Sequence, residues 1–110
     1  MLSIQLPMIF FKAVESGLFR SQGRGINWTK LSDSVIGTYA VETRNDGLII
    51  VSGSFGVMRG LDNGSSWTHV LNTVGAFGNG IAFGSGETVF TCSILDGLFL
   101  STDNGLSWNR

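Results

Sequence analysis

The sequence has few of the residue types on which catalytic and metal sites most often depend. Its 110 residues include one cysteine, one histidine, one tyrosine and one proline. A single cysteine, Cys92, excludes an internal disulfide framework and a cysteine-based zinc cluster, and a single histidine, His69, excludes a histidine-pair metal site. Only 14% of residues are charged and no lysine or arginine cluster occurs, so a nucleic-acid-binding surface is not expected. Cys92 lies in an apolar strand-like run, which predicts a buried side chain.

Glycine and apolar residues, in contrast, are plentiful. Sixteen glycines indicate many turns and few long helices, and an apolar share of 43% is enough for a core. The opening run MLSIQLPMIFF is too short to span a bilayer. Lys12 follows this run instead of preceding it, unlike the basic residue of a signal peptide, so the run is predicted to be strand.

One segment occurs three times without a gap, each time running from a glycine to a tryptophan. The copies are GLFRSQGRGINW, GVMRGLDNGSSW and GLFLSTDNGLSW, which cover residues 17–28, 56–67 and 97–108. The tryptophans are 39 and 41 residues apart. A period near 40 residues with a constant internal pattern is typical of repeat architectures.

Short apolar runs precede each copy and predict the rest of the repeat. Residues 9–16, 48–55 and 89–96 occupy equivalent positions in an ungapped alignment and have the composition of buried strands. With an earlier run and a short one after the tryptophan, each repeat has four short antiparallel strands, the make-up of a β-propeller blade. We therefore predict an all-β fold of three blade-like antiparallel four-stranded repeats of about 40 residues, a partial or open β-propeller. The units are an incomplete first blade (1–36), a complete blade (37–74) and an incomplete third blade (75–110).

The turn before each tryptophan has its own chemistry. Aspartate and serine side chains accept backbone N–H bonds two residues on, and Asn-Gly pairs suit the positive φ of hairpin turns. The tryptophan follows on the returning strand, where its ring can cover the hairpin. These features predict a rigid hairpin turn covered by the apolar ring of the tryptophan.

These segments resemble Asp-box repeats, also called bacterial neuraminidase repeats, whose pattern is Ser-x-Asp-x-Gly-x-Thr-Trp. The resemblance implies a structural motif on the hairpin between the third and fourth strands of a blade, facing away from the ligand-binding end. The second copy has Gly60 where the pattern has serine, and the first has Gly23 where it has aspartate. A looser resemblance, in residues 75–108, is to phage tail-fibre and virion repeat proteins. The residues that match the Asp-box are Ser21, Gly25, Trp28, Asp62, Gly64, Trp67, Ser101, Asp103, Gly105 and Trp108.

Catalysis is not expected from this set of residues, although sialidases carry Asp-boxes. Sialidases use an arginine triad, a tyrosine–glutamate pair and an aspartate spread around six blades, and their Arg-Ile-Pro motif is absent here. The only tyrosine is Tyr39, and Arg20 and Arg59 occupy equivalent repeat positions, which favours a repeated role over a catalytic one. No catalytic residue, metal or cofactor is predicted.

Structural roles are also favoured over functional ones for the other candidate residues. The acidic turns around Asp62 and Asp103 lack the further carboxylates of a calcium loop. The carboxylates of Glu15, Glu42 and Glu87 are expected to be solvated rim charges, with a general acid or base role as the alternative. Aromatic rings such as Phe55, Phe77 and Trp28 could stack on sugars, but core packing is favoured.

The expected role is a non-enzymatic structural or binding module in a larger assembly such as a virion or tail fibre. Repeats of this kind do not bury their faces alone, so protein partners or symmetry copies are expected to complete the sheet edges, through contacts at residues 1–12 and 98–110. A glycan is a further candidate partner, whereas membrane insertion is not expected. The alternative is a fragment of a sialidase-like glycosidase or glycan-binding propeller. A virion or extracellular location fits the first reading.

Overall fold

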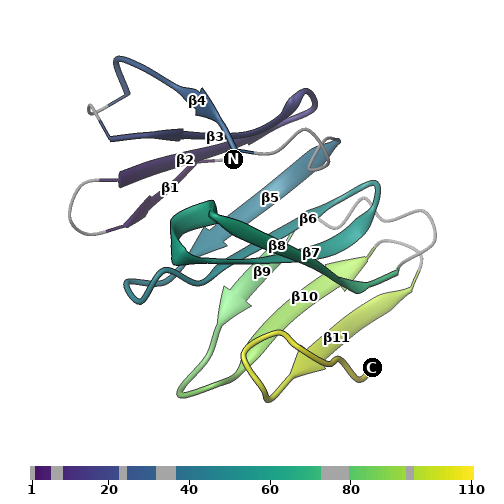
Figure 1. Ribbon diagram of the computed structural model, residues 1–110. Helices are drawn as coiled ribbons and strands as arrows, with labels where there is room; N and C mark the ends of the chain where they lie inside the picture. Colours follow the sequence, from purple (N-terminus) through teal and green to yellow (C-terminus); the bar gives the residue numbers. More distant parts are fainter. Residues whose placement is uncertain (1, 6–8, 23–24, 32–36, 73–79, 94–95) are drawn as a thin grey trace.

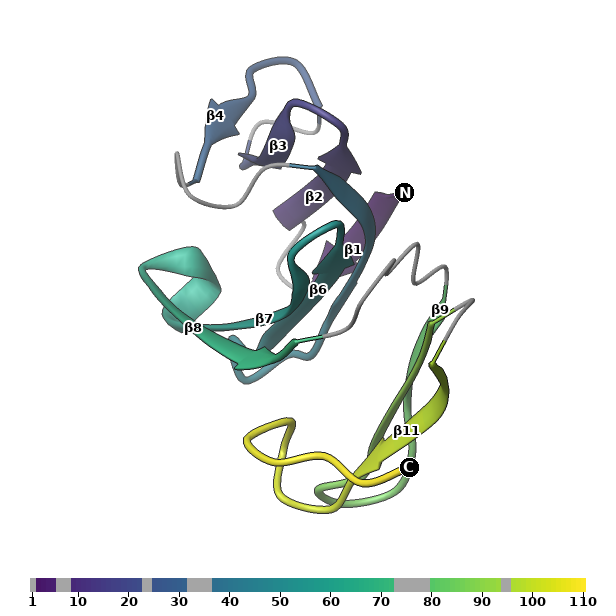
Figure 2. The same cartoon turned by 90° about the vertical axis from the view of Figure 1, so that its right-hand side faces the viewer.

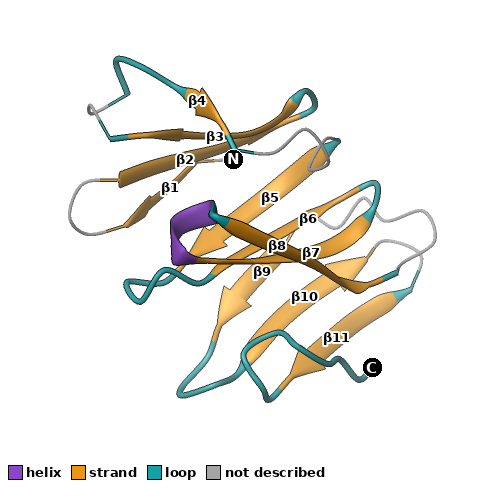
Figure 3. Cartoon of the chain, viewed as in Figure 1, coloured by secondary structure: helices purple, strands orange, loops and turns teal. Residues whose placement is uncertain are grey.

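The computed structural model shows three antiparallel sheets, which confirms that the chain is all-β (Figures 1 and 3). Two of these sheets have the four strands predicted for each repeat, and the third has three in the described residues. It describes residues 2–5, 9–22, 25–31, 37–72, 80–93 and 96–110, without the side chains of Ser3, Gln5 and Tyr39. Within each sheet, the strands are neighbours in chain order.

The first sheet contains β1 (Leu2–Gln5), β2 (Ile9–Val14), β3 (Gly17–Ser21) and β4 (Thr29–Lys30). The second contains β5 (Thr38–Thr43), β6 (Ile49–Gly53), β7 (Gly56–Leu61) and β8 (Ser66–Leu71), with the 3-10 turn η1 (Asp62–Gly64) before β8. The third contains β9 (Gly80–Phe83), β10 (Val89–Ser93) and β11 (Gly97–Ser101). Beyond β11, Asn109 bridges back to Leu100 through two backbone hydrogen bonds of 2.6 and 2.8 Å.

The ungapped alignment of the third repeat is wrong by one residue upstream of Gly97. Val89 pairs with Ser101, whereas in the second sheet the residue opposite Gly60 is Ile49. Val89 is therefore the counterpart of Ile49 and not of Leu48. The cause is hairpin length, because three residues separate the paired Ser93 and Gly97 where two separate Gly53 and Gly56. A shift of one residue moves every side chain of a strand to the opposite face.

Each sheet has two faces, which we name by their residues. The forward face carries Phe11 in β2, Ile50 in β6 and Phe90 in β10, and the rear face carries the alternate residues Phe10, Ile49 and Val89. Side chains alternate between these faces along a strand, and residues paired across two strands lie on the same face. The pairing therefore assigns every neighbouring residue to one face or the other.

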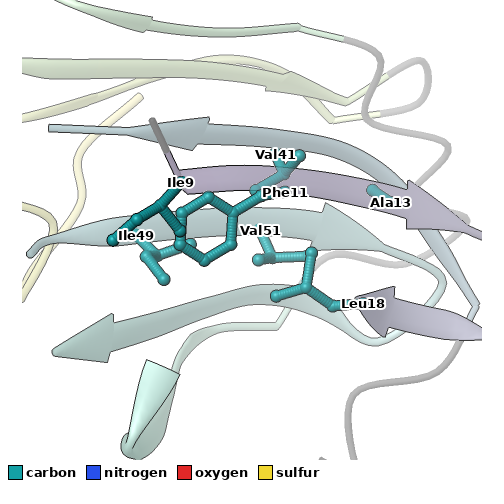
Figure 4. Packing of buried hydrophobic residues seen from close by; sticks show 7 residues of the cluster. All are labelled: Ile9, Phe11, Ala13, Leu18, Val41, Ile49 and Val51. Carbon is teal, nitrogen blue, oxygen red and sulfur yellow. The ribbon is translucent and has the colours of Figure 1, made fainter. Parts of the chain in front are cut away.

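The core lies between the sheets, which are stacked as three successive layers (Figures 1 and 2). The forward face of the first sheet packs on the rear face of the second, as Figure 4 shows. The forward face of the second sheet packs in turn on the third sheet's rear face. All of β6 is buried because both of its faces are covered. The first cluster contains Ile9, Phe11, Ala13, Leu18, Val41, Ile49 and Val51, and the second contains Ala40, Leu48, Ile50, Val57, Ile81 and Val89.

Candidate functional site

The third turn, residues 101–108, is held by its own side chains. The buried Ser101 hydroxyl accepts hydrogen bonds from the backbone N–H groups of Gly105 (2.8 Å) and Asp103 (3.3 Å) and donates one to Asp103 Oδ1 (2.7 Å). Ser107 donates to the same carboxylate from its backbone (2.9 Å) and from its hydroxyl (2.5 Å). Gly105 has a φ of 84°, a conformation that glycine adopts without a Cβ penalty. Both carboxylate oxygens of Asp103 are thus engaged inside the turn.

All three turns share one tryptophan contact. The indole Nε1 donates a hydrogen bond to the carbonyl of the glycine three residues earlier, at 2.9 Å in the first turn and 3.0 Å in the other two. That glycine has a positive φ each time, at 85°, 97° and 84° along the chain. The glycine and the tryptophan of the sequence pattern therefore form one structural unit. The three pairs are Gly25 with Trp28, Gly64 with Trp67, and Gly105 with Trp108.

The first turn keeps the serine contact of the third, because Ser21 Oγ accepts a hydrogen bond from Gly25 N at 2.9 Å. The second turn is built differently. A Cβ placed on Gly60 would lie 2.7 Å from Cζ3 of Trp67, so the indole occupies the space that a serine side chain needs. This turn is closed by the backbone bond from Ser65 N to Leu61 O (3.1 Å), and its exposed Asp62 has a φ of 53°. Gly23 in the first turn lies outside the described residues.

Two arginines at equivalent positions connect neighbouring sheets through these turns. Arg20 Nη1 on the first sheet donates to the carbonyl of Asn63 in the second turn at 2.6 Å. Arg59 Nε on the second sheet donates to the carbonyl of Asn104 in the third turn at 2.8 Å. Leu100 occupies the corresponding position in the third sheet. The repeated role that the sequence indicated for these arginines is therefore a contact from each sheet to the next.

Arg44 adds a second contact at the third turn, where its Nη1 donates to Asn104 Oδ1 at 2.8 Å. Its guanidinium also forms a salt bridge with Asp46 at 2.7 Å, which raises the pKa of Arg44 and lowers the pKa of Asp46. In the second turn, the buried Oδ1 of Asn63 has no hydrogen-bond partner. The third turn is therefore the more completely bonded of the two.

The remaining candidates do not gather at a common centre. His69 Nε2 lies 2.6 Å from the carbonyl of Phe55, which can only accept, so this nitrogen carries the proton. Burial raises the pKa of Glu42. The backbone carbonyls of Glu15 and Glu87 accept hydrogen bonds from Gly37 N (2.7 Å) and Asn104 N (2.9 Å), respectively. Arg24, Phe77 and the Tyr39 side chain fall outside the described residues.

The described ranges contain neither a cluster of metal-ligating residues nor a membrane-spanning helix. None of their acidic, histidine and cysteine residues form a group of three or more that could hold a metal ion. No helix in the same ranges has the length and apolar character needed to cross a membrane.

The sequence did not predict one surface feature, a groove on the third sheet. The forward face of the third sheet carries a groove of about 230 Å³, lined by Gly80, Ile81, Ala82, Phe90, Thr91, Cys92 and Leu98. Cys92 is exposed there, so the prediction that it is buried is wrong. Its run is apolar on both faces, but only the rear face packs against the second sheet. A strand with apolar residues on both faces was the signal that could have identified this groove.

Comparison with protein-family models and with curated protein sequences finds no match to this chain.

The Asp103 carboxyl gives a direct test of the third turn. Hydrogen bonds from Ser107 and then Ser101 lower its pKa from 3.8 to about 2. The ionised form is therefore stabilised by folding, and this stabilisation is complete above the unfolded pKa and lost as the pH falls from about 4 to about 2. We expect Ser107→Ala to raise the pKa of Asp103, as measured by NMR titration of the carboxyl carbon. Ser65→Ala is the control and should leave it near 2, and an unchanged value in Ser107→Ala would contradict the assignment.

Proposed function

We propose that this chain is a non-catalytic structural and binding module built from three Asp-box propeller blades, working inside a larger assembly such as a virion or tail fibre. One observation carries the proposal. The same apolar contact, forward face on rear face, is made twice within the chain, and the two outermost faces also carry exposed apolar side chains. Blades of a propeller pack on both neighbours in this way.

The turns support a scaffold role over a ligand site. The Asp103 carboxylate is occupied by Ser101 and Ser107, and the arginines Arg20 and Arg59 donate to backbone carbonyls of the adjacent turn. A sialidase-like site needs several guanidinium groups that converge on a substrate carboxylate. Here the two equivalent arginines contact two different turns, so each serves its own pair of sheets.

A glycan-binding propeller is the second candidate, and one feature favours it. The half-buried Trp28 indole lies on the open rear face of the first sheet, with Lys12 Nζ 4.6 Å from its ring centroid. A ring in this position can stack on a sugar, and the lysine ammonium beside it can donate hydrogen bonds to sugar hydroxyls. The same residues also fit a protein contact, in which the ring and the lysine stem are covered together.

The proposal is tested by measuring both activities on the intact chain. We expect no hydrolysis of a fluorogenic sialoside above the buffer rate, and no saturable change in tryptophan fluorescence when sialyllactose is added. Turnover that follows the protein peak through successive chromatography steps would contradict the non-catalytic role. A saturable fluorescence change that is lost in Trp28→Ala would establish the glycan-binding alternative instead.

A further inference from the structure

The forward face of the third sheet is apolar and open. Its groove side chains are Ala82, Phe90, Cys92 and Leu98, and Leu100 continues the same face beside Phe90. Leu98 is 60% exposed, and none of these residues is charged. The counterparts of this face in the first and second sheets are buried against the next sheet along the chain. This face therefore resembles one side of a sheet-to-sheet interface, without a described sheet packed against it.

The rear face of the first sheet is open in the same way. The pairing of β1, β2 and β3 puts Leu2, Ile4, Phe10 and Phe19 on it, and Ile4 is 55% exposed. The pairing also puts two lysines on this face, Lys12 and Lys30. The Nζ of Lys12 lies over the Phe19 and Trp28 rings, 5.4 and 4.6 Å from their centroids. In that position the ammonium is held against aromatic faces by cation–π attraction.

The two open faces match the two halves of the internal contact. On the rear side, the pairing makes Phe10 the counterpart of Ile49, which packs against the first sheet. On the forward side, Leu98 is the counterpart of Val57, which packs against the third sheet. A fourth sheet placed on the groove by the same repeated contact would present to it a rear face like that of the first sheet.

We propose that the third sheet's forward face binds the first sheet's rear face of a second copy of this chain, head to tail. This inference rests on the proposed function and names its partner. A contact between two different faces is heterologous, so it closes into a ring when the rotation per sheet allows it. Two copies supply six sheets, within the range of roughly four to eight blades found in closed propellers.

The contact between copies differs from the internal ones in its polar part. In each internal contact an arginine, Arg20 or Arg59, donates a hydrogen bond to a turn carbonyl of the next sheet. Leu100 occupies the equivalent position at the groove and has no such donor. The contact between copies therefore depends on apolar burial, without the arginine hydrogen bond. Surface charge pairs weaken as salt screens them, and apolar contacts are strengthened by sulfate. We expect ammonium sulfate to favour the dimer.

Two single variants test the arrangement, with mass measured by light scattering during gel filtration. The unaltered chain is expected at twice the 11.8 kDa of one copy. Leu98→Glu and Ile4→Glu each place a charge on one open face, so each alone should have the mass of one copy. Mixed together, they should recover the mass of two, because each variant keeps the face that the other has lost. Leu106→Glu, at a turn residue 54% exposed and on neither strand face, is the matched control and should behave as the unaltered chain.

Several outcomes would overturn the inference. The unaltered chain at the mass of one copy would do so, as would single variants that still dimerise, since a contact between like faces survives when the other face is altered. A mixture that stays at the mass of one copy would also exclude head-to-tail docking. Circular dichroism of each variant separates loss of folding from loss of association. If the unaltered chain is monomeric and has no sialoside turnover, the inference fails and the non-catalytic role stands; turnover removes that role.

Discussion

Replacing Ile50 by alanine is expected to lower the free energy of unfolding by about 2–5 kcal/mol. Ile50 is fully buried on the forward face of the second sheet, in the cluster that joins this sheet to the third. Its Cδ1 also covers the third turn, because a Cβ placed on Gly105 would lie 2.8 Å from it. Alanine would leave a cavity between the second sheet and both the strands and the turn of the third.

Urea denaturation followed by circular dichroism measures this effect as a lower midpoint with an unchanged slope. Ile26→Ala is the matched control, since Ile26 is 80% exposed and a surface change of this kind is expected to stay within about 0.5 kcal/mol. Equal midpoints for the two variants would show that the contact between the second and third sheets contributes little to stability.

The second large effect is expected at Trp108, where alanine should cost about 3 kcal/mol, the lower end for a tryptophan because this ring is only half-buried. The indole packs against the cluster between the second and third sheets and donates to Gly105 O at 3.0 Å. Trp108→Phe keeps most of the ring and removes the N–H donor, so it should cost about 1 kcal/mol. The two variants therefore separate ring packing from the hydrogen bond.

Thermal and urea unfolding of the Trp108 pair provide the measurement. A loss in Trp108→Phe as large as that in Trp108→Ala would mean that the hydrogen bond, and not the ring, holds the third turn. Neither variant is expected to abolish ligand binding selectively, because Trp108 has a structural contact in the turn.

Much of the fold could be predicted from sequence because its local signals agree. The glycine-to-tryptophan spacing is constant. In each turn the indole N–H donates a hydrogen bond to the carbonyl of a glycine with positive φ. Short apolar runs rich in β-branched and aromatic residues marked the strands, and the all-β prediction followed. The register of β10 was harder to predict from sequence. One additional residue before Gly97 leaves the composition of the run unchanged but moves its side chains to the opposite faces of the sheet.

Contacts between sheets were harder to predict than contacts within them. Arg20 and Arg59 stand out as equivalent positions, but the period of the repeat does not say that each reaches the turn of the following sheet. Gly60 departs from the Asp-box pattern, and only the position of the Trp67 ring explains why a glycine is accommodated there. Long-range partners of this kind depend on how layers stack, which neither propensity nor periodicity encodes.

The tryptophan contact has a consequence for spectroscopy. The chain has three tryptophans, one in the turn of each sheet, and each indole N–H is bonded within its own turn. The three indole resonances of a proton–nitrogen correlation spectrum therefore act as three built-in reporters at known places along the stack. Followed through a denaturation series on nitrogen-15-enriched protein, they distinguish a chain that opens one layer at a time from one that opens all at once, without an extrinsic probe.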